Sequence, residues 1–231
     1  MSGVQTNKIT GSFVSVLNND STAVKLIIGG IVAFFAAVVI IGGIKRIGRI
    51  ASMLVPFMSL LFIAMAFIII GKNYTAIPET FRLIFTSAFS SKAVAGGVGG
   101  FAFSQIIKKG LARGVFSNEA GLGSSVIAHS ASETREPVKQ GLWGIFEVFF
   151  DTFVICTLTA LVILTTNIGT GAYENGSFFG AENAAGEFVG ASDSATALSA
   201  FSSNLGTFGT VAFLIILPLF AFTTVLAWSY Y

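Results

Sequence analysis

The chain has 231 residues, of which 54% are hydrophobic and only 10% are charged, and its formal net charge is +2. A soluble domain carries about 25% charged residues, so this composition excludes an ordinary soluble protein and predicts one that is solvated largely by lipid. The small, scattered positive charge argues against a nucleic-acid-binding protein. A single cysteine, Cys156, excludes an internal disulfide.

In chain order, residues 1–21 are polar and lack the basic and apolar regions of a signal peptide, so we expect a loop there. Both ends of the sequence look cut, and we expect an internal fragment of a longer protein. Crossing about 30 Å of hydrocarbon takes roughly 20 apolar residues. Four runs meet this requirement, and they are 23–43, 50–71, 142–166 and 209–229.

The charges between these runs predict an orientation. Lys45, Arg46 and Arg49 lie in the short link after the first run, and short basic loops stay in the cytoplasm. The loops 72–109 and 167–208 are then expected outside, and the second of these contains no Lys or Arg. Within the first outer loop, residues 79–92 are typical of an amphipathic helix at the membrane surface.

This orientation requires one more crossing, because the second run ends outside while the run 142–166 begins inside. The candidate is 110–131, which contains the polar stretch GVFSNEAGLGSSVIAHSA. Backbone at membrane depth leaves the helix only where protein or water satisfies it. We therefore expect a helix that is broken between about Asn118 and Ser124, where Gly121 and Gly123 supply conformational freedom. An outer loop followed by a re-entrant turn is the alternative. The prediction is an all-α polytopic membrane protein, one transmembrane domain over 1–231 with about five crossings, Met1 outside and Tyr231 inside.

Two acidic residues lie within the run 142–166. Glu147 and Asp151 are four residues apart and share one helical face. A carboxylate is costly in a bilayer, so this face is expected to look toward protein partners or water. The pair could coordinate a cation or carry a proton, or it could hydrogen-bond the broken helix and hold it open. The structural or gating role is favoured for Glu147, and both roles stay open for Asp151.

The final run offers further polar groups in AFTTVLAWSYY. Thr224 and Trp228 share a helical face, and the paired hydroxyls of Thr223 and Thr224 suit a hard cation such as sodium. Trp228 either closes one side of a small-ligand pocket or belongs to the interfacial aromatic belt.

The broken segment carries the remaining candidates. For His129, the only histidine, helix capping or packing is favoured over proton transfer. Glu119 is either an anchor for Arg113, which is favoured, or part of a cation site. No Cys or His cluster has metal spacing and no nucleophile has a suitable base, so we expect no enzyme.

The motifs GVFSNEAGLGSSVIAHSASETREPVKQGL, FDTFVICTLTALVIL and AFTTVLAWSYY resemble the alanine or glycine:cation symporter family, the sodium-coupled amino acid transporters of bacteria and archaea. The resemblance covers most of the chain. It implies a leucine-transporter-like fold of two inverted five-helix repeats, with ligand bound at broken helices one and six. The present spans would be helices four to eight, with helix six discontinuous, and helices of the parent protein that are missing here would complete the site.

The resemblance, added to the patterns above, assigns a role to each candidate. Leu122 and Trp228 would leave room only for a small substrate side chain. The substrate-binding residues are expected to be Asn118, Gly121, Leu122, Gly123, Thr224 and Trp228, the sodium ligands Thr223, Thr224 and Asp151, and the structural or gating residues Arg113, Glu119 and Glu147.

The expected function is sodium-coupled symport of a small neutral amino acid, alanine or glycine, across the cell membrane of a bacterium or archaeon. The partners are the amino acid, the sodium ion, the lipid bilayer and the missing helices, with no nucleic acid and no cofactor besides the coupling ion. An ion-conducting pore and a non-transporting truncated fragment are the alternatives, and the residues alone leave proton coupling open.

Overall fold

Within the residues that the structure describes, four helices are long and apolar enough to cross a membrane. The computed structural model describes residues 2–17, 21–88, 107–108, 110–112, 114–115, 117–118, 121, 123, 126, 129–130, 132–171, 180–182, 188–190 and 193–229. The four helices cover Thr22–Ile40, Lys45–Lys72, Pro137–Gly169 and Ala195–Trp228, and each overlaps one predicted apolar run. The prediction of an all-α polytopic membrane protein is confirmed.

The described helices are α1 (Ser2–Leu17), α2 (Thr22–Ile40), α3 (Gly43–Lys72), α4 (Ile77–Ala88), α8 (Pro137–Phe149), α9 (Thr157–Gly169) and α10 (Asp193–Ser229). A 3-10 turn, Tyr74–Ala76, joins α3 to α4, and a π-helical stretch, Phe150–Cys156, joins α8 to α9. Two short strands, β1 (Gly180–Glu182) and β2 (Phe188–Gly190), pair antiparallel within the loop between α9 and α10, with Ala181 opposite Val189. This ribbon lies outside the helical bundle and leaves its all-α character unchanged.

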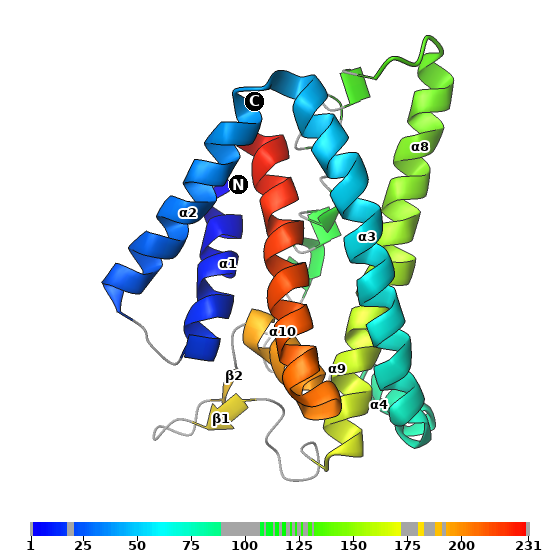
Figure 1. Ribbon diagram of the computed structural model, residues 1–231. Coiled ribbons are helices and arrows are strands. Elements are labelled where there is room, and N and C mark those ends of the chain that lie inside the picture. The colour runs from blue at the N-terminus through cyan, green and yellow to red at the C-terminus, as the bar shows by residue number, and fades with distance from the viewer. Residues whose placement is uncertain are drawn as a thin grey trace.

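The first helix is a correction to the sequence prediction. Residues 1–21 were expected to form a loop, but Ser2–Leu17 form α1, which packs mainly against α10 (Figure 1). Two of its polar side chains, Thr10 and Ser12, are buried and bond to their own helix. Thr10 donates to the carbonyl of Thr6 at 2.9 Å and Ser12 to that of Lys8 at 2.8 Å, next to the buried Ile9. A hydroxyl satisfied in this way needs no water, so a run of low hydropathy can pack inside a bundle.

The link between the first two spans is shorter than predicted. Helix α2 ends at Ile40 and α3 begins at Gly43, whose φ of 72° makes the sharp turn that glycine allows. The basic residues Lys45, Arg46 and Arg49 therefore lie in the first turns of α3 rather than in a loop.

The larger apolar core joins α3, α9 and α10. Phe201 of α10 is fully buried, with its ring 5.8 Å from that of Phe62 and 5.2 Å from that of Phe213. Val162 of α9 completes this cluster. A second cluster at the other end of α3 and α10 joins Ile47 to Val225 and Leu226, together with residues of α2.

Helix α10 is interrupted near its start. Gly206 has φ 59° and ψ −141°, which is outside the helical range, so a first part before Gly206 and a longer second part meet at this residue. Gly209 then lies directly against the backbone carbonyl of Phe201, where a Cβ atom would not fit. Helix α10 thus begins at Asp193, within the predicted outer loop 167–208.

Helix α8, the π-helical stretch and α9 form one continuous helical rod over Pro137–Gly169, which we call the α8–α9 rod. Helix α3 and this rod point in the same direction (Figure 1). At the end of α3, Asn73 bonds Asn204 and lies against Gly169, the last residue of α9. The chain therefore leaves α3 and α4 at one end of the bundle and enters α8 at the other. The segment between Ala88 and Pro137 must travel the length of the bundle, which supports the additional crossing predicted from the charges.

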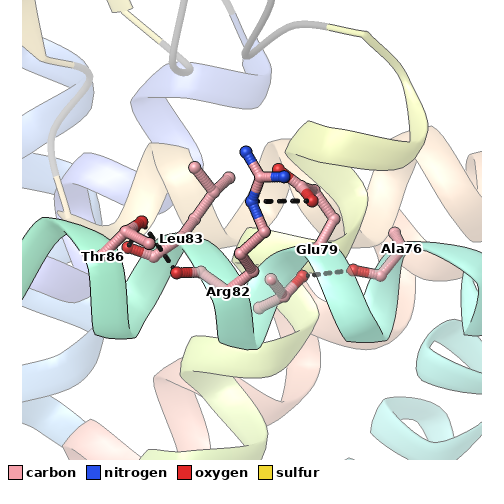
Figure 2. A network of polar contacts seen from close by, with 6 residues as sticks. Ala76, Glu79, Arg82, Leu83 and Thr86 are labelled. Atoms are coloured by element: carbon pink, nitrogen blue, oxygen red, sulfur yellow. Dashed lines mark hydrogen bonds and ion pairs between the residues drawn. The ribbon is translucent and has the colours of Figure 1, made fainter.

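Helix α4 is the described part of the amphipathic helix predicted at 79–92. Figure 2 shows its exposed face, where the side chains of Glu79 and Arg82 form an ion pair of 3.5 Å. On the opposite side, Thr80 is buried and donates to the carbonyl of Ala76 at 2.7 Å. Helix α4 packs against α9, so it covers the end of the bundle where α3 and α9 finish.

Candidate ligand-binding site

The polar stretch between the spans is interrupted where the sequence predicts a break. The backbone amide and the side-chain amide of Asn118 both donate to the carbonyl of Gly114 at 3.1 Å, which closes a last helical turn. Gly121 and Gly123 then have φ angles of 77° and 81°, in the left-handed region that glycine adopts without strain. His129 is again helical. The described residues of this segment therefore show helix, two left-handed glycines, and helix.

The residues just before the break contact the middle of the α8–α9 rod. The hydroxyl of Ser117 donates to the carboxylate of Asp151 at 2.6 Å, and that of Thr152 donates to the side-chain oxygen of Asn118 at 2.9 Å. The thiol of Cys156 lies 3.9 Å from the same Asp151 oxygen. We call Ser117, Asn118, Asp151 and Thr152 the Asp151 group.

The π-helical stretch Phe150–Cys156 positions this group. Its wider turns are an irregularity that occurs frequently at functional sites. The hydroxyl of Thr157 supports the stretch by donating to the carbonyl of Thr152, five residues earlier, at 3.4 Å. On another side of the stretch, the rings of Phe149 and Phe153 stack with their centroids 5.0 Å apart.

After the break, His129 contacts α8 along much of its length. His129 meets Gln140 through Nδ1, at 2.6 Å, and Glu147 through Nε2, at 3.8 Å. Contacts that pair 117 with 151 and 129 with 140 and 147 mean that the segment runs antiparallel to α8. This is the direction that a crossing between α4 and α8 requires.

Asp151 is half-buried and, among the described residues, no lysine or arginine lies within ion-pair distance of it. The group around it offers one carboxylate, one amide oxygen and two hydroxyls, which are all hard oxygen donors. Oxygen donors of this kind suit a small hard cation. No group of three or more His, Cys, Asp or Glu that would hold a transition metal exists in the described part of the chain.

The predicted residues on α10 stand apart from this group. The hydroxyls of Thr223 and Thr224 both donate to the carbonyl of Phe220, at 2.8 and 3.0 Å, and Trp228 is half-buried. The adjacent Val225 and Leu226 pack against α2 and α3. Among the described contacts, none joins these residues to the Asp151 group. Arg113, Glu119 and Leu122 lie outside the described residues.

Sequence reasoning missed the partners of Asp151, because Ser117 and Thr152 only become significant once the segment is placed antiparallel to α8.

It also missed a polar network at the end of α3. Asn73 donates to Asn204 at 2.6 Å, and Asn204 donates to the buried Thr166 at 2.8 Å. Asn167, next to Thr166, is fully buried, and its side-chain oxygen has no hydrogen-bond partner in the described structure. The signal that the sequence offered for this network was three asparagines close to the ends of spans, Asn73, Asn167 and Asn204.

Four described helices that are long and apolar enough to cross a membrane define the class of polytopic membrane proteins. The profile of the sodium:alanine symporter family matches residues 1–231, and the chain belongs to that family.

Individual relatives agree with this assignment. The chain is 38% identical over 228 residues to an uncharacterized transporter of Haemophilus influenzae, covering 98% of this chain and 45% of that protein. It is 39% identical over 228 residues to the sodium/alanine symporter AgcS of Methanococcus maripaludis, covering 99% and 45%. It is 36% identical over 230 residues to a sodium/proton-dependent alanine carrier protein of Bacillus sp. strain PS3, covering 100% and 49%. The chain spans about half the length of the curated relatives it matches.

Proposed function

We propose that the protein containing this chain carries out sodium-coupled symport of a small neutral amino acid, alanine or glycine, across the cell membrane. The observation that supports this most directly is the Asp151 group, because it sets beside a helix break a carboxylate that no described lysine or arginine pairs with. Family membership and the named alanine carriers among the relatives support the same substrate class.

Sodium binds at the Asp151 group. The hydroxyl of Ser117 donates its hydrogen to Asp151 at 2.6 Å. A hydroxyl also has two lone pairs, so a rotation about one bond turns this donor into a ligand. The carboxylate, Ser117, Asn118 and Thr152 then supply oxygens to one cation. Thr223 and Thr224 stand apart from this group and are proposed to ligate sodium at a separate position on α10, because a hydroxyl that donates to its own helix keeps lone pairs for a cation.

The amino acid binds at the break itself. Val126, His129 and Ser130 are helical after the left-handed Gly123, and the N-terminal end of such a half-helix attracts the substrate carboxylate. Asn118 and the backbones of Gly121, Leu122 and Gly123 surround it. Thr224 and Trp228 close the pocket from α10 and limit the volume that a side chain can occupy.

The topology proposed for this function has five crossings, with helix six broken and the helices arranged as in the leucine-transporter-like inverted repeat. The parallel directions of α3 and the α8–α9 rod support the extra crossing. Arg113, Glu119 and Glu147 are proposed to hold or gate the broken helix, and the contact between His129 and Glu147 supports this role for Glu147.

The test uses the intact protein that carries this chain, reconstituted into liposomes. Uptake of labelled alanine should require an inward sodium gradient and should persist when the membrane potential and the pH gradient are clamped. Uptake driven equally by a pH gradient would instead establish proton coupling. A current that persists without alanine would favour an ion-conducting pore, and the absence of both activities would overturn the proposal.

Substrate size gives a second test of the same site. Trp228→Ala should widen the pocket, so competition by leucine against labelled alanine should become stronger relative to competition by glycine, alanine and serine. A site selects a small ligand by excluding volume as well as by attraction. An unchanged ranking in a normally expressed variant would assign Trp228 to the membrane interface instead.

A further inference from the structure

Helix α8 lies at the edge of the described bundle (Figure 1), and none of its described residues is buried. An open hollow of about 420 Å³ lies along its first turns and is lined by Lys139, Leu142, Trp143 and Phe146. These residues follow the spacing i, i+3, i+4 and i+7, so they form one stripe of the helix. The stripe begins with a cation and continues with three large apolar side chains.

Two aromatic rings shape the wall of this hollow. Trp143 meets Phe146 edge-on, with centroids 5.8 Å apart and planes at 90°, and Phe146 stacks on Phe150 at 6.0 Å. Rings that are held by their neighbours lose little freedom when a ligand lies against them. Trp143 and Phe146 are nevertheless 63% and 55% exposed. The hollow is therefore apolar, shaped in advance and open to the surroundings of the helix.

The position of the hollow along the α8–α9 rod places it at the membrane surface. The rod covers 33 residues, which is about 50 Å at 1.5 Å per residue, whereas the hydrocarbon of a bilayer is about 30 Å thick. The ends of the rod therefore extend into the headgroup layers. Lys139 comes just before the apolar run 142–166, so its ammonium group reaches the headgroups while Trp143 and Phe146 lie where the hydrocarbon begins.

The charges around Lys139 leave its ammonium group able to exchange partners. It pairs with Glu136 at 3.0 Å, and both side chains are 64% exposed. Exposed pairs of this kind contribute little free energy, so a phosphate group can take the place of the carboxylate. Arg135 and Glu133, in the link before α8, carry opposite charges. Glu147, the next acid on α8, is two turns deeper and faces His129.

The end of the bundle at which α8 begins is also the more basic end of the membrane-spanning helices. Lys45, Arg46 and Arg49 lie in the first turns of α3 at this end, which is the one predicted to face the cytoplasm. The cytoplasmic leaflet is the one that carries anionic lipids. At the opposite end of the rod, the last turn of α9 contains no basic residue, so the sequence of cation and apolar stripe is not repeated there.

We propose that this hollow binds an anionic phospholipid, with the lipid phosphate on Lys139 and an acyl chain against Leu142, Trp143 and Phe146. A ligand for the stripe needs a negative group at one end and an apolar chain beyond it, and such a lipid has both in this order. A zwitterionic lipid brings a cation of its own to the level of Lys139, so it should bind more weakly. The proposed site requires only that the helix lies in a membrane and is independent of the proposed transport.

The test measures the fluorescence of Trp143 in the intact protein that carries this chain, reconstituted into phosphatidylcholine vesicles. The vesicles contain either brominated phosphatidylglycerol or brominated phosphatidylcholine, because bromine on an acyl chain quenches an indole that it contacts. The contribution of Trp143 is the part of the emission that is lost in Trp143→Phe. One lysine near an anionic surface contributes about a five-fold preference, so the association constant from quenching should be about five times greater for phosphatidylglycerol.

Three variants assign this preference to its residue. Lys139→Gln should bring the ratio of the two association constants close to one. Glu136→Gln should raise the ratio, because the phosphate then displaces no carboxylate. Arg82→Gln is the matched control, since Arg82 forms the same exposed i, i+3 pair with Glu79 on α4, at the other end of the bundle. It should keep the parent's ratio.

Equal quenching by both lipids in the parent, or a preference that survives Lys139→Gln, would overturn the proposal. Emission from Trp143 that neither lipid quenches would do the same, because it would mean that another part of the protein or a second copy covers this face. Inorganic phosphate should weaken the preference no more than chloride does at the same ionic strength. A specific loss in phosphate would identify a site for a soluble anion instead of a lipid.

Discussion

Two polar regions of this chain are built from similar residues, yet they differ in how completely their hydrogen bonds are used. The network at the end of α3 joins Asn73, Asn204 and Thr166 from three helices. The Asp151 group joins the broken segment to the π-helical stretch. The first connects the packed ends of helices, and the second lies where a helix is interrupted.

The network at the end of α3 is closed. Asn73 donates to Asn204, Asn204 donates to Thr166, and Thr166 donates to the carbonyl of Val162 at 2.6 Å, while the second hydrogens of both amides go to their own helices. Hydrogen bonds satisfied in this way favour a unique packing, and the exception beside them is the buried side-chain oxygen of Asn167, which has no partner in the described structure. The Asp151 group carries a negative charge without a cation among the described residues and uses hydroxyls that can turn. The comparison supports a structural role for the first region and the proposed binding role for the second.

The largest effect is expected from Asp151→Asn, which removes the charge of the binding region and keeps its shape. A hydrogen bond or ligand contact to a charged group is worth about 1.5–3 kcal/mol, so the apparent affinity for sodium in alanine uptake should fall roughly 10- to 150-fold. Thermal unfolding in detergent should change little, because Ser117 can donate equally well to the amide oxygen.

The matched control is Glu79→Gln, which neutralises an acid in the exposed ion pair of α4 shown in Figure 2. Its sodium affinity should equal that of the parent, since exposed pairs of this kind contribute little. Equal losses in both variants would mean that net charge, and not the Asp151 group, sets sodium affinity.

The next largest effect is expected from Asn204→Leu, which should lower stability and leave sodium affinity unchanged. Asn204→Leu leaves Asn73 without its acceptor and Thr166 without its donor, and the unfolding free energy should fall by about 1–2 kcal/mol. The midpoint of thermal unfolding measures this loss, while sodium affinity should stay at the parent's value. Ser203→Ala, on the neighbouring exposed position where the hydroxyl bonds only Ser199, serves as the control. A drop in sodium affinity without a loss of stability would contradict the division between the two regions.

A smaller effect is expected at the candidate ligands of α10. Thr224→Ala removes one neutral oxygen, and a neutral contact contributes about 1 kcal/mol, so sodium affinity should fall roughly five-fold. Thr224→Ser keeps the oxygen and should restore the parent's value. If both variants lose affinity equally, packing of the threonine methyl group, and not ligation, explains the effect.

The fold could be predicted from sequence where a single physical requirement decided it. The length of the apolar runs located the four described spans. The charges of the loops placed them on alternate sides of the membrane, and this arrangement required one more crossing. The contacts of Ser117 and His129, which run antiparallel to α8, support the direction of that crossing. The left-handed φ angles of Gly121 and Gly123 support the break predicted there. Hydropathy failed for α1, because Thr10 and Ser12 bury their hydroxyls by local bonding that no hydropathy sum includes.

The site was less predictable than the fold. The sequence singled out Asp151 but not Ser117 and Thr152, because common hydroxyl residues gain meaning only from what lies opposite them. It identified Glu147 and His129 separately, with no means of showing that they face each other across two elements. The network of Asn73 and Asn204 connects residues far apart in the chain, and its existence depends on how the end of α3 meets the start of α10.

The smallest effect is expected from Lys72, which lies beside the network at the end of α3 and tests which residues belong to it. Just before the interruption of α10 at Gly206, the carbonyl of Asn204 accepts a hydrogen bond from Lys72 of α3 at 2.7 Å. A cation at the C-terminal end of a helix is worth about 0.3–1 kcal/mol at an exposed position. Lys72→Met should therefore lower the unfolding free energy by this small amount, and by less in high salt, since salt screens an exposed charge. Lys72→Arg should preserve stability at both salt concentrations. A loss in Lys72→Met as large as that in Asn204→Leu would mean that the lysine belongs to the network itself, whereas the structure gives it the role of a cap on a broken helix.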